Sequence, residues 1–176
     1  MPWELVIVKY SGPPPLHRTE AEMAREVPLG TRADIRSHIS RVLPSMQWHE
    51  EPSLLELTKA RGSDSWKSWD AEQMEAWSQP RLIAVFESNE IELTMFGFGQ
   101  KDPVESLYVE IHGGADPIRV LQLLCEPGNW TVAEVDRDAE IIDLSGPKAR
   151  LQWEKWQAYL QNVIDQFEES EDDSES

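Results

Sequence analysis

The sequence predicts an α+β fold with a largely antiparallel sheet: a central three-stranded meander, an N-terminal strand, a late hairpin, and three main helices packed mainly on one face. Three runs with strand composition (81–87, 90–98 and 104–111) support the meander, because the connections between them are too short for parallel crossovers. Two further segments, 31–43 and 147–167, repeat apolar residues at helical spacing. We therefore expect five to seven strands with helices above them.

The chain opens with a strand over residues 3–10, which are rich in β-branched and aromatic side chains. Residues 11–15 contain three successive prolines, which a strand cannot continue through. The first helix begins at Thr31, whose hydroxyl can cap the backbone, and ends at Pro44.

Residues 46–79 carry no clear period. The apolar piece 54–57 fits either a strand or a helix, and 70–77 fits a short helix capped by Asp70. The stretch 63–70 sets two tryptophans among small polar residues, a composition typical of interaction hot spots. Alternatively, these rings cover the edge of the sheet. The candidate partner-binding residues are Glu50, Glu51, Asp64, Trp66, Trp69 and Asp70.

The later elements follow simple signals. Apolar residues alternate with polar ones over 90–98, which predicts one packed and one solvated face. A second helix begins with Asp116 as its N-cap and Pro117 at its first position. The runs 130–135 and 140–144 predict a final hairpin.

The most distinctive short motif is His112-Gly113-Gly114, placed where a strand passes into a helix. Paired glycines there could direct backbone N–H groups at an anion, and with Asp136 they form a candidate ligand site. The competing interpretation is a glycine turn followed by the cap Asp116. The sequence lacks the Gly-x-Ser-x-Gly elbow that a hydrolase would need.

Catalytic and metal chemistry find little support. The four histidines have no ligand spacing, and the single cysteine, Cys125, excludes an internal disulfide and a cysteine-based zinc site. We expect no cofactor and no metal, and we favour a non-enzymatic role without excluding an enzyme.

The formal net charge of −17 argues against nucleic acid or an anionic membrane as a direct partner. The segment 168–176 contributes six acids, so the rest of the chain still carries −11. This charge keeps a protein soluble, and it also attracts a basic partner. We expect one domain over 1–167, a disordered acidic tail over 168–176, and a cytoplasmic location, since no signal peptide or membrane span is visible.

The helix over 147–167 has an apolar stripe too long and too aromatic to face water. It is expected to dock on the body of the chain, or else on another subunit, so both a monomer and a homodimer are considered. The stripe contains Trp153, Trp156, Leu160, Val163, Ile164 and Phe167.

Several short motifs resemble a family of small, uncharacterised bacterial α+β proteins. They include the opening run 3–8, the helix start at 28–31, the 112–117 turn, the Gly128-Asn129-Trp130 segment and 142–144. The resemblance covers roughly residues 3–144 and implies an α+β fold, but no activity or catalytic residue.

The expected function is an acidic protein-binding module, for example an immunity or inhibitor protein that blocks a basic toxin. The alternatives are a small ligand-binding protein or enzyme with its site near His112–Asp116, and a dimerising structural module.

Overall fold

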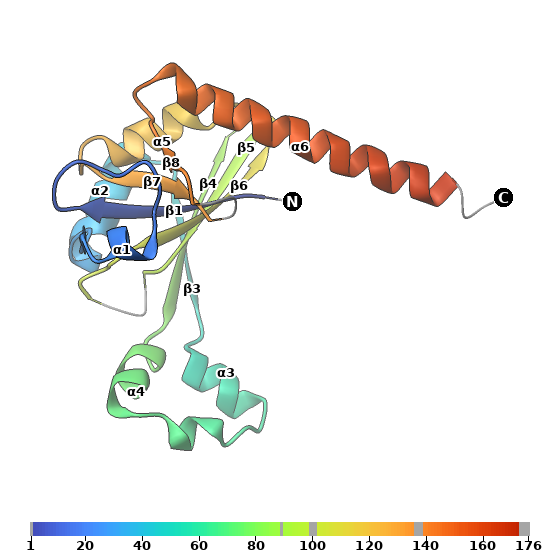
Figure 1. Ribbon diagram of the computed structural model, residues 1–176. Coiled ribbons are helices and arrows are strands. Elements are labelled where there is room, and N and C mark those ends of the chain that lie inside the picture. Colours follow the sequence, from blue (N-terminus) through green and yellow to red (C-terminus); the bar gives the residue numbers. More distant parts are fainter. Residues whose placement is uncertain (1, 89, 99–101, 136–138, 173–176) are drawn as a thin grey trace.

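An eight-stranded antiparallel sheet organises the chain, as a computed structural model shows (Figure 1). The structure describes residues 2–88, 90–98, 102–135 and 139–172, with side chains up to residue 166. The strands of this described part are β1 (Trp3–Tyr10), β2 (Glu26–Val27), β3 (Gln47–Glu51), β4 (Arg81–Ser88), β5 (Ile91–Phe96), β6 (Leu107–Gly113), β7 (Thr131–Glu134) and β8 (Ile141–Ile142). Their order is β3-β4-β5-β6-β1-β7-β8, and β2 pairs with β1. The predicted antiparallel α+β fold is confirmed.

Six α-helices and one 3-10 helix occur in the described residues, where the sequence predicts three main helices and one further short one. They are α1 (Glu20–Met23), α2 (Arg32–Val42), α3 (Leu54–Ala60), η1 (Ser65–Ser68), α4 (Ala71–Trp77), α5 (Ile118–Cys125) and α6 (Pro147–Asp172). The ambiguous run 54–57 is helical, and Asp70 caps α4 as expected.

The core lies between the sheet and the helices α2, α5 and the first turns of α6. Alternate strand residues point into it, including Leu5 in β1, Leu93 in β5 and Ile111 in β6, all at most 1% exposed. These three lie close together because Leu5 pairs with Val109, two residues before Ile111, and Leu93 pairs with Ile111. The predicted central meander is therefore β4-β5-β6, with β1 added at its edge.

Helix starts match the sequence signals with one shift. The hydroxyl of Thr31 accepts a hydrogen bond from the Asp34 N–H at 3.2 Å, which caps α2. The carboxylate of Asp116 accepts one from the Ile118 N–H at 2.9 Å, but α5 begins at Ile118, one residue later than predicted. Pro117 is the N-cap residue, and its carbonyl accepts the first helical hydrogen bond, from the Leu121 N–H at 3.0 Å.

The opposite face of β1 is also buried. Val6, Val8 and Tyr10 form a small second cluster with Ala133. The proline-rich connection after β1 closes beside this cluster, since the Leu16 carbonyl accepts a hydrogen bond from the Ile141 N–H at 3.0 Å. Because both faces of β1 are covered, its sequence reads as a continuous apolar run rather than an alternating one.

One part of the chain stands away from this body. The strands β3 and β4 end in a helical module (residues 53–80) that contains α3, η1 and α4 and lies at the far end of the hairpin (Figure 1). No residue from 54 to 80 is buried. The helices therefore form with little help from a hydrophobic core.

The last helix, α6, packs on the body at its beginning. Trp153 lies 5.4 Å from Trp3 between ring centroids, and the Gln157 side chain donates to the Gly113 carbonyl at 3.5 Å. Beyond this point α6 projects away from the sheet (Figure 1). It continues to Asp172, so residues 168–172, predicted to be disordered, are helical. No helix of the described residues is both long and apolar enough to cross a lipid bilayer.

Candidate partner-binding site

The helical module is held together by local capping. Ser53 and Glu56 form a reciprocal capping box at α3, with distances of 3.1 and 3.0 Å. Asp70 and Gln73 form the same motif at α4, with distances of 2.8 and 3.1 Å. Such caps satisfy N–H groups that short helices leave unpaired, which explains how two seven-residue helices persist outside the core.

The tryptophans of the module are half-buried and pack against one another or under lysines. Trp69 meets Trp77 edge-on, with ring centroids 4.7 Å apart. The Lys59 ammonium lies 4.5 Å from the Trp66 ring centre, and Lys67 lies 5.8 Å from it. Exposed contacts of this kind contribute about 0.5–1 kcal/mol each. Trp69 therefore packs inside the module, against Trp77. Trp66 is covered by two lysine side chains, which a partner could displace.

The acidic candidates differ in whether their carboxylates already have a partner within the chain. Glu51 pairs with Arg81 at 3.0 Å, and Asp70 is occupied as the cap of α4. Asp64 pairs with Lys67 at 3.1 Å, but this pair is strongly exposed and contributes little. Glu50 is exposed on the edge strand β3. The six predicted residues therefore share one end of the molecule, although they do not converge on a single point.

A groove that the sequence analysis missed runs between α4 and the β5–β6 connection. Two adjoining pockets, of about 430 and 500 Å³, share Glu72, Ala76 and Glu105 in their walls. Asp102 lies in the second, and it accepts a hydrogen bond from the Arg32 N–H at 3.1 Å. We call this the acidic groove, and its carboxylates are Glu72, Glu75, Asp102 and Glu105.

No local signal marks this groove, because its two walls are about thirty residues apart in sequence. The acids at 72 and 75 lie on one face of α4, while 102 and 105 follow β5. The antiparallel β4–β5 hairpin brings the two walls together, because the end of β5 returns beside the start of β4, which directly follows α4. Carboxylates gathered in this way favour a cationic ligand surface.

The glycine turn at His112 directs two of its backbone N–H groups at the neighbouring strand of the sheet. The N–H groups of Gly114 and Ala115 both donate to the Glu90 carbonyl, at 3.1 and 3.4 Å. A Cβ on Gly113 would lie 2.0 Å from that same oxygen, and the φ angle of Gly113 is +108°. Only glycine permits this approach, which favours the interpretation as a structural turn. The other predicted member of the site, Asp136, lies outside the described residues.

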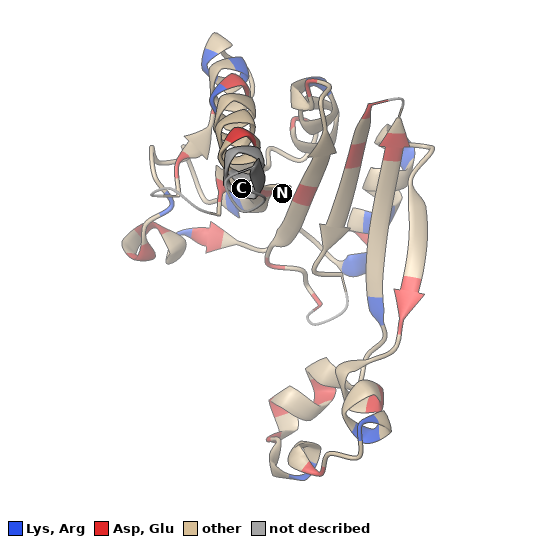
Figure 2. Cartoon of the chain, turned by 90° about the vertical axis from the view of Figure 1, so that its right-hand side faces the viewer, with Lys and Arg blue, Asp and Glu red and all other residues tan. Residues whose placement is uncertain are grey.

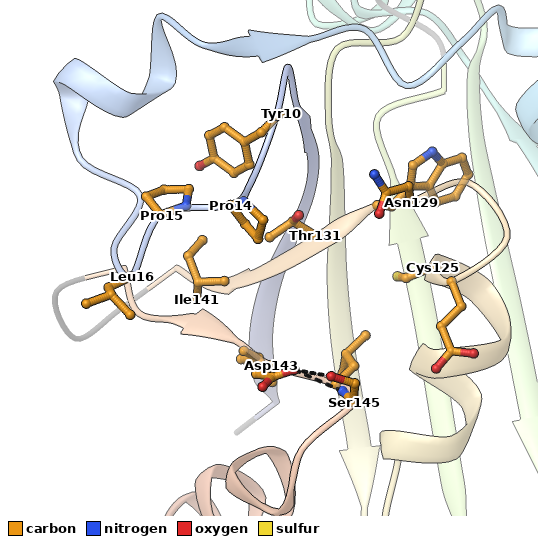
Figure 3. A pocket seen from close by; sticks show the side chains of 15 residues that line it. Tyr10, Pro14, Pro15, Leu16, Cys125, Asn129, Thr131, Ile141, Asp143 and Ser145 are labelled. Carbon is orange, nitrogen blue, oxygen red and sulfur yellow. Dashed lines mark hydrogen bonds between the residues drawn. The ribbon is translucent and has the colours of Figure 1, made fainter.

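A pocket separate from the acidic groove, of about 430 Å³, opens between the proline-rich connection and the α5–β7 turn (Figure 3). Pro14, Pro15 and Ile141 form its apolar wall. At its lower rim, the Ser145 hydroxyl and N–H donate to Asp143 at 2.6 and 3.1 Å, and these bonds hold the pKa of Asp143 below its usual value.

Cys125 lines this pocket, but its thiol is buried and is not a reactive nucleophile. Its side chain is 1% exposed, and burial raises the pKa of the thiol far above the ordinary range. The thiolate needed for nucleophilic chemistry is therefore not formed near neutral pH. Cys125 is therefore a residue of the hydrophobic core.

No protein-family model, no curated protein and no solved structure matches the chain.

Proposed function

We propose that this chain is a non-enzymatic binding protein that uses the helical module and the acidic groove to hold, and thereby inhibit, a basic partner protein such as a toxin. The observation that carries the proposal is the position of the module. Twenty-seven residues (54–80) add no buried side chain to the core, yet they hold half-buried tryptophans, and their helix α4 contributes two carboxylates to the acidic groove.

Physical considerations support this use of the module. Binding residues concentrate on segments that a rigid scaffold positions but does not need for its own stability. Tryptophan supplies large contact area, and carboxylates raise the rate of encounter with a basic surface. The net charge of −17 adds a long-range field of the same sign.

The test is affinity capture from the native host at low and high salt, with the full chain as bait. Three further baits isolate the site: Trp66→Ala, the charge reversal Glu72→Lys with Glu75→Lys, and a chain in which Asn-Gly replaces residues 52–80. The last variant keeps the hairpin, because Glu51 pairs with Arg81 and Asn-Gly forms a tight two-residue turn.

A matched control reverses two exposed acids far from the groove, Glu20→Lys with Glu87→Lys. We expect one basic protein to bind the unmodified chain and the control, and to be lost from the charge-reversed and module-free baits. A protein retained equally by all baits, or no protein at low salt, contradicts the proposal. Circular dichroism of each bait confirms that the fold persists.

A second candidate function is binding of a small ligand, which the pocket beside Ile141 supports better than the His112 turn (Figure 3). Its volume of about 430 Å³ and its mixed apolar and polar wall match the general character of ligand sites. A small-molecule screen by NMR, with chemical shifts followed at Thr131 and Ile141, tests it. Shifts confined to the acidic groove would instead favour the first proposal.

A further inference from the structure

The sheet opens between β4 and β5 where the hairpin approaches the helical module. Strand β4 pairs with β3 over residues 81–85, but it pairs with β5 only over residues 84–88. Among the strand pairs of the described residues, 81–83 therefore have a partner on one side alone. Figure 2 shows the β3–β4 hairpin extending past the end of β5 toward the module. Such an edge presents backbone N–H and C=O groups to which another strand can add.

Gly97 produces this opening. Its φ angle is +112°, which L residues rarely adopt, so the chain leaves the direction of β5 at this point. An added Cβ would lie only 2.8 Å from the Ser106 carbonyl oxygen, so the bend places Gly97 close to the start of β6. Phe98 then enters the core, fully buried, with its ring 5.2 Å from that of Trp48. The chain after β5 thus packs on the core and does not continue along β4.

A pocket of about 390 Å³ occupies the opening. Its wall includes Ile83, Phe96 and Tyr108, all half-buried. Phe96 and Tyr108 are paired across β5 and β6, and their ring centroids are 6.0 Å apart. A concave wall of partly buried apolar side chains favours apolar groups of a ligand.

This pocket continues into the acidic groove. It shares Gly97 and Tyr108 with the nearer groove pocket, and the two groove pockets share Glu72 and Glu105. In the farther groove pocket, the described wall holds four carboxylates and one base, Arg32. The three pockets therefore form a row that is acidic at one end and apolar at the other. An occupant that fits the whole row is positive at one end and apolar at the other.

We propose that an extended segment of a partner protein binds along this row of pockets and adds a strand to residues 81–83 of β4. Its apolar side chains contact Ile83 and Phe96, and its Lys or Arg side chains lie among the acids of the groove. In strand addition, backbone hydrogen bonds supply affinity and alternate side chains supply specificity. The inference rests on the proposed function, because it names the part of the basic partner that is held.

Charge selects this occupant over the other strands that an open edge could accept. The carboxylates of the groove repel an acidic segment, and they also disfavour a second copy of this chain, whose net charge is −17.

The first test uses random peptides displayed on phage and selected on the full chain at low salt. Peptides of about twelve residues suffice, since they span about 40 Å when extended. We expect enriched sequences that join a cluster of Lys or Arg to a run in which apolar residues alternate. Enrichment of acidic or uncharged sequences, or no enrichment, overturns the proposal.

The second test measures the affinity of an enriched peptide, made synthetically and labelled, by fluorescence anisotropy. Ile83→Lys places a charge in the opening and should weaken binding by at least about tenfold. The matched control is Val85→Lys, two residues along the same face of β4. Val85 is also half-buried, but it pairs with Thr94 of β5 and does not line the pocket. Equal affinities for the two variants overturn the proposal, and circular dichroism checks that both are folded.

Strand addition itself is tested on the peptide backbone. Methylation of alternate amide nitrogens blocks the hydrogen bonds along one edge of an extended peptide and spares the other edge. One of the two alternating sets should abolish binding, while the other leaves it within about threefold. Equal effects of both sets overturn strand addition.

Capture from the native host separates this inference from the proposed function. A basic protein that is released by Glu72→Lys with Glu75→Lys, but retained by Ile83→Lys, upholds the proposed function and overturns strand addition. Peptides that bind as expected while no basic protein is captured support the binding row and contradict the inhibitor function.

Discussion

The sheet body and the helical module are built from similar helices and strands, but different forces hold them. In the body, α2 and α5 bury whole faces against the sheet, with Ile39 and Leu121 fully buried. In the module, α3 and α4 bury no residue and depend on two capping boxes and one pair of tryptophan rings. Burial of a large apolar side chain contributes about 1.5–3 kcal/mol, and a cap contributes about 1 kcal/mol. We therefore expect two units of very different stability, in which the weaker one is free to adapt to a partner.

The largest effect should come from the centre of the sheet. Leu93→Ala removes a side chain that is fully buried between β4 and β6. We expect a loss of about 2–5 kcal/mol in the free energy of unfolding, measured in urea. Leu57→Ala, the same change in the module, should alter the free energy of unfolding by less than about 1 kcal/mol, since Leu57 is only half-buried. Equal losses at both sites would contradict the division into two units.

A somewhat smaller effect is expected at the β6–α5 turn. Gly113→Ala forces a side chain against the Glu90 carbonyl in a backbone conformation that L residues rarely adopt. The strain and the clash together should cost about 2–4 kcal/mol. Gly114→Ala is the control, because nothing lies within 4 Å of its added methyl group. Thermal unfolding should show a clear drop for Gly113→Ala and almost none for its neighbour.

His38 offers an intermediate case at the contact of α2 and α5. Its Nε2 donates to the Leu124 carbonyl at 2.8 Å, and its ring meets Trp130 edge-on at 4.9 Å. This carbonyl belongs to the last turn of α5, where intrahelical partners run out. His38→Ala should lower the free energy of unfolding by about 1–2 kcal/mol. Ser37→Ala, on an exposed neighbour, should leave the urea midpoint unchanged.

The smallest global effect should come from the caps of the module. Asp70→Ala removes one half of the α4 capping box, at a local cost of about 1 kcal/mol. Amide exchange should therefore rise within α4, while the unfolding midpoint of the sheet stays the same. Thr31→Ala makes the equivalent change at α2 and should lower the midpoint. A global loss from Asp70→Ala would show that the module and the body unfold together.

The sequence predicts the elements that bury an apolar face and misses those that do not. The strand β1, the meander, α2 and α5 all have a period that burial imposes on them. The two-residue strand β2 has no room for a period, so the sequence does not predict it, whereas the predicted late hairpin is confirmed as β7 and β8. The short helices of the module are marked by caps alone, so only Asp70 drew attention to α4.

The same reasoning explains what was found of the candidate site. Trp66 and Trp69 stand out by composition, and the structure places them in one exposed module. The acids of the groove do not stand out among the 33 acids of the chain. They are close together in space, but their spacing in the sequence gives no sign of this. For α6, the sequence predicts an apolar face correctly, but a stripe does not specify what covers it. The structure places the first turns on the body, with Trp153 against Trp3.

The attachment of the module has a consequence for limited proteolysis. Both of its ends emerge from one antiparallel pair, β3 and β4, whose register runs from Gln47↔Val85 to Glu51↔Arg81. A single cut in the exposed stretch around Gly62 would therefore yield two fragments that the sheet continues to hold side by side. The nicked protein should migrate as one species in a native gel and as two in a denaturing one, with its core intact and its module opened.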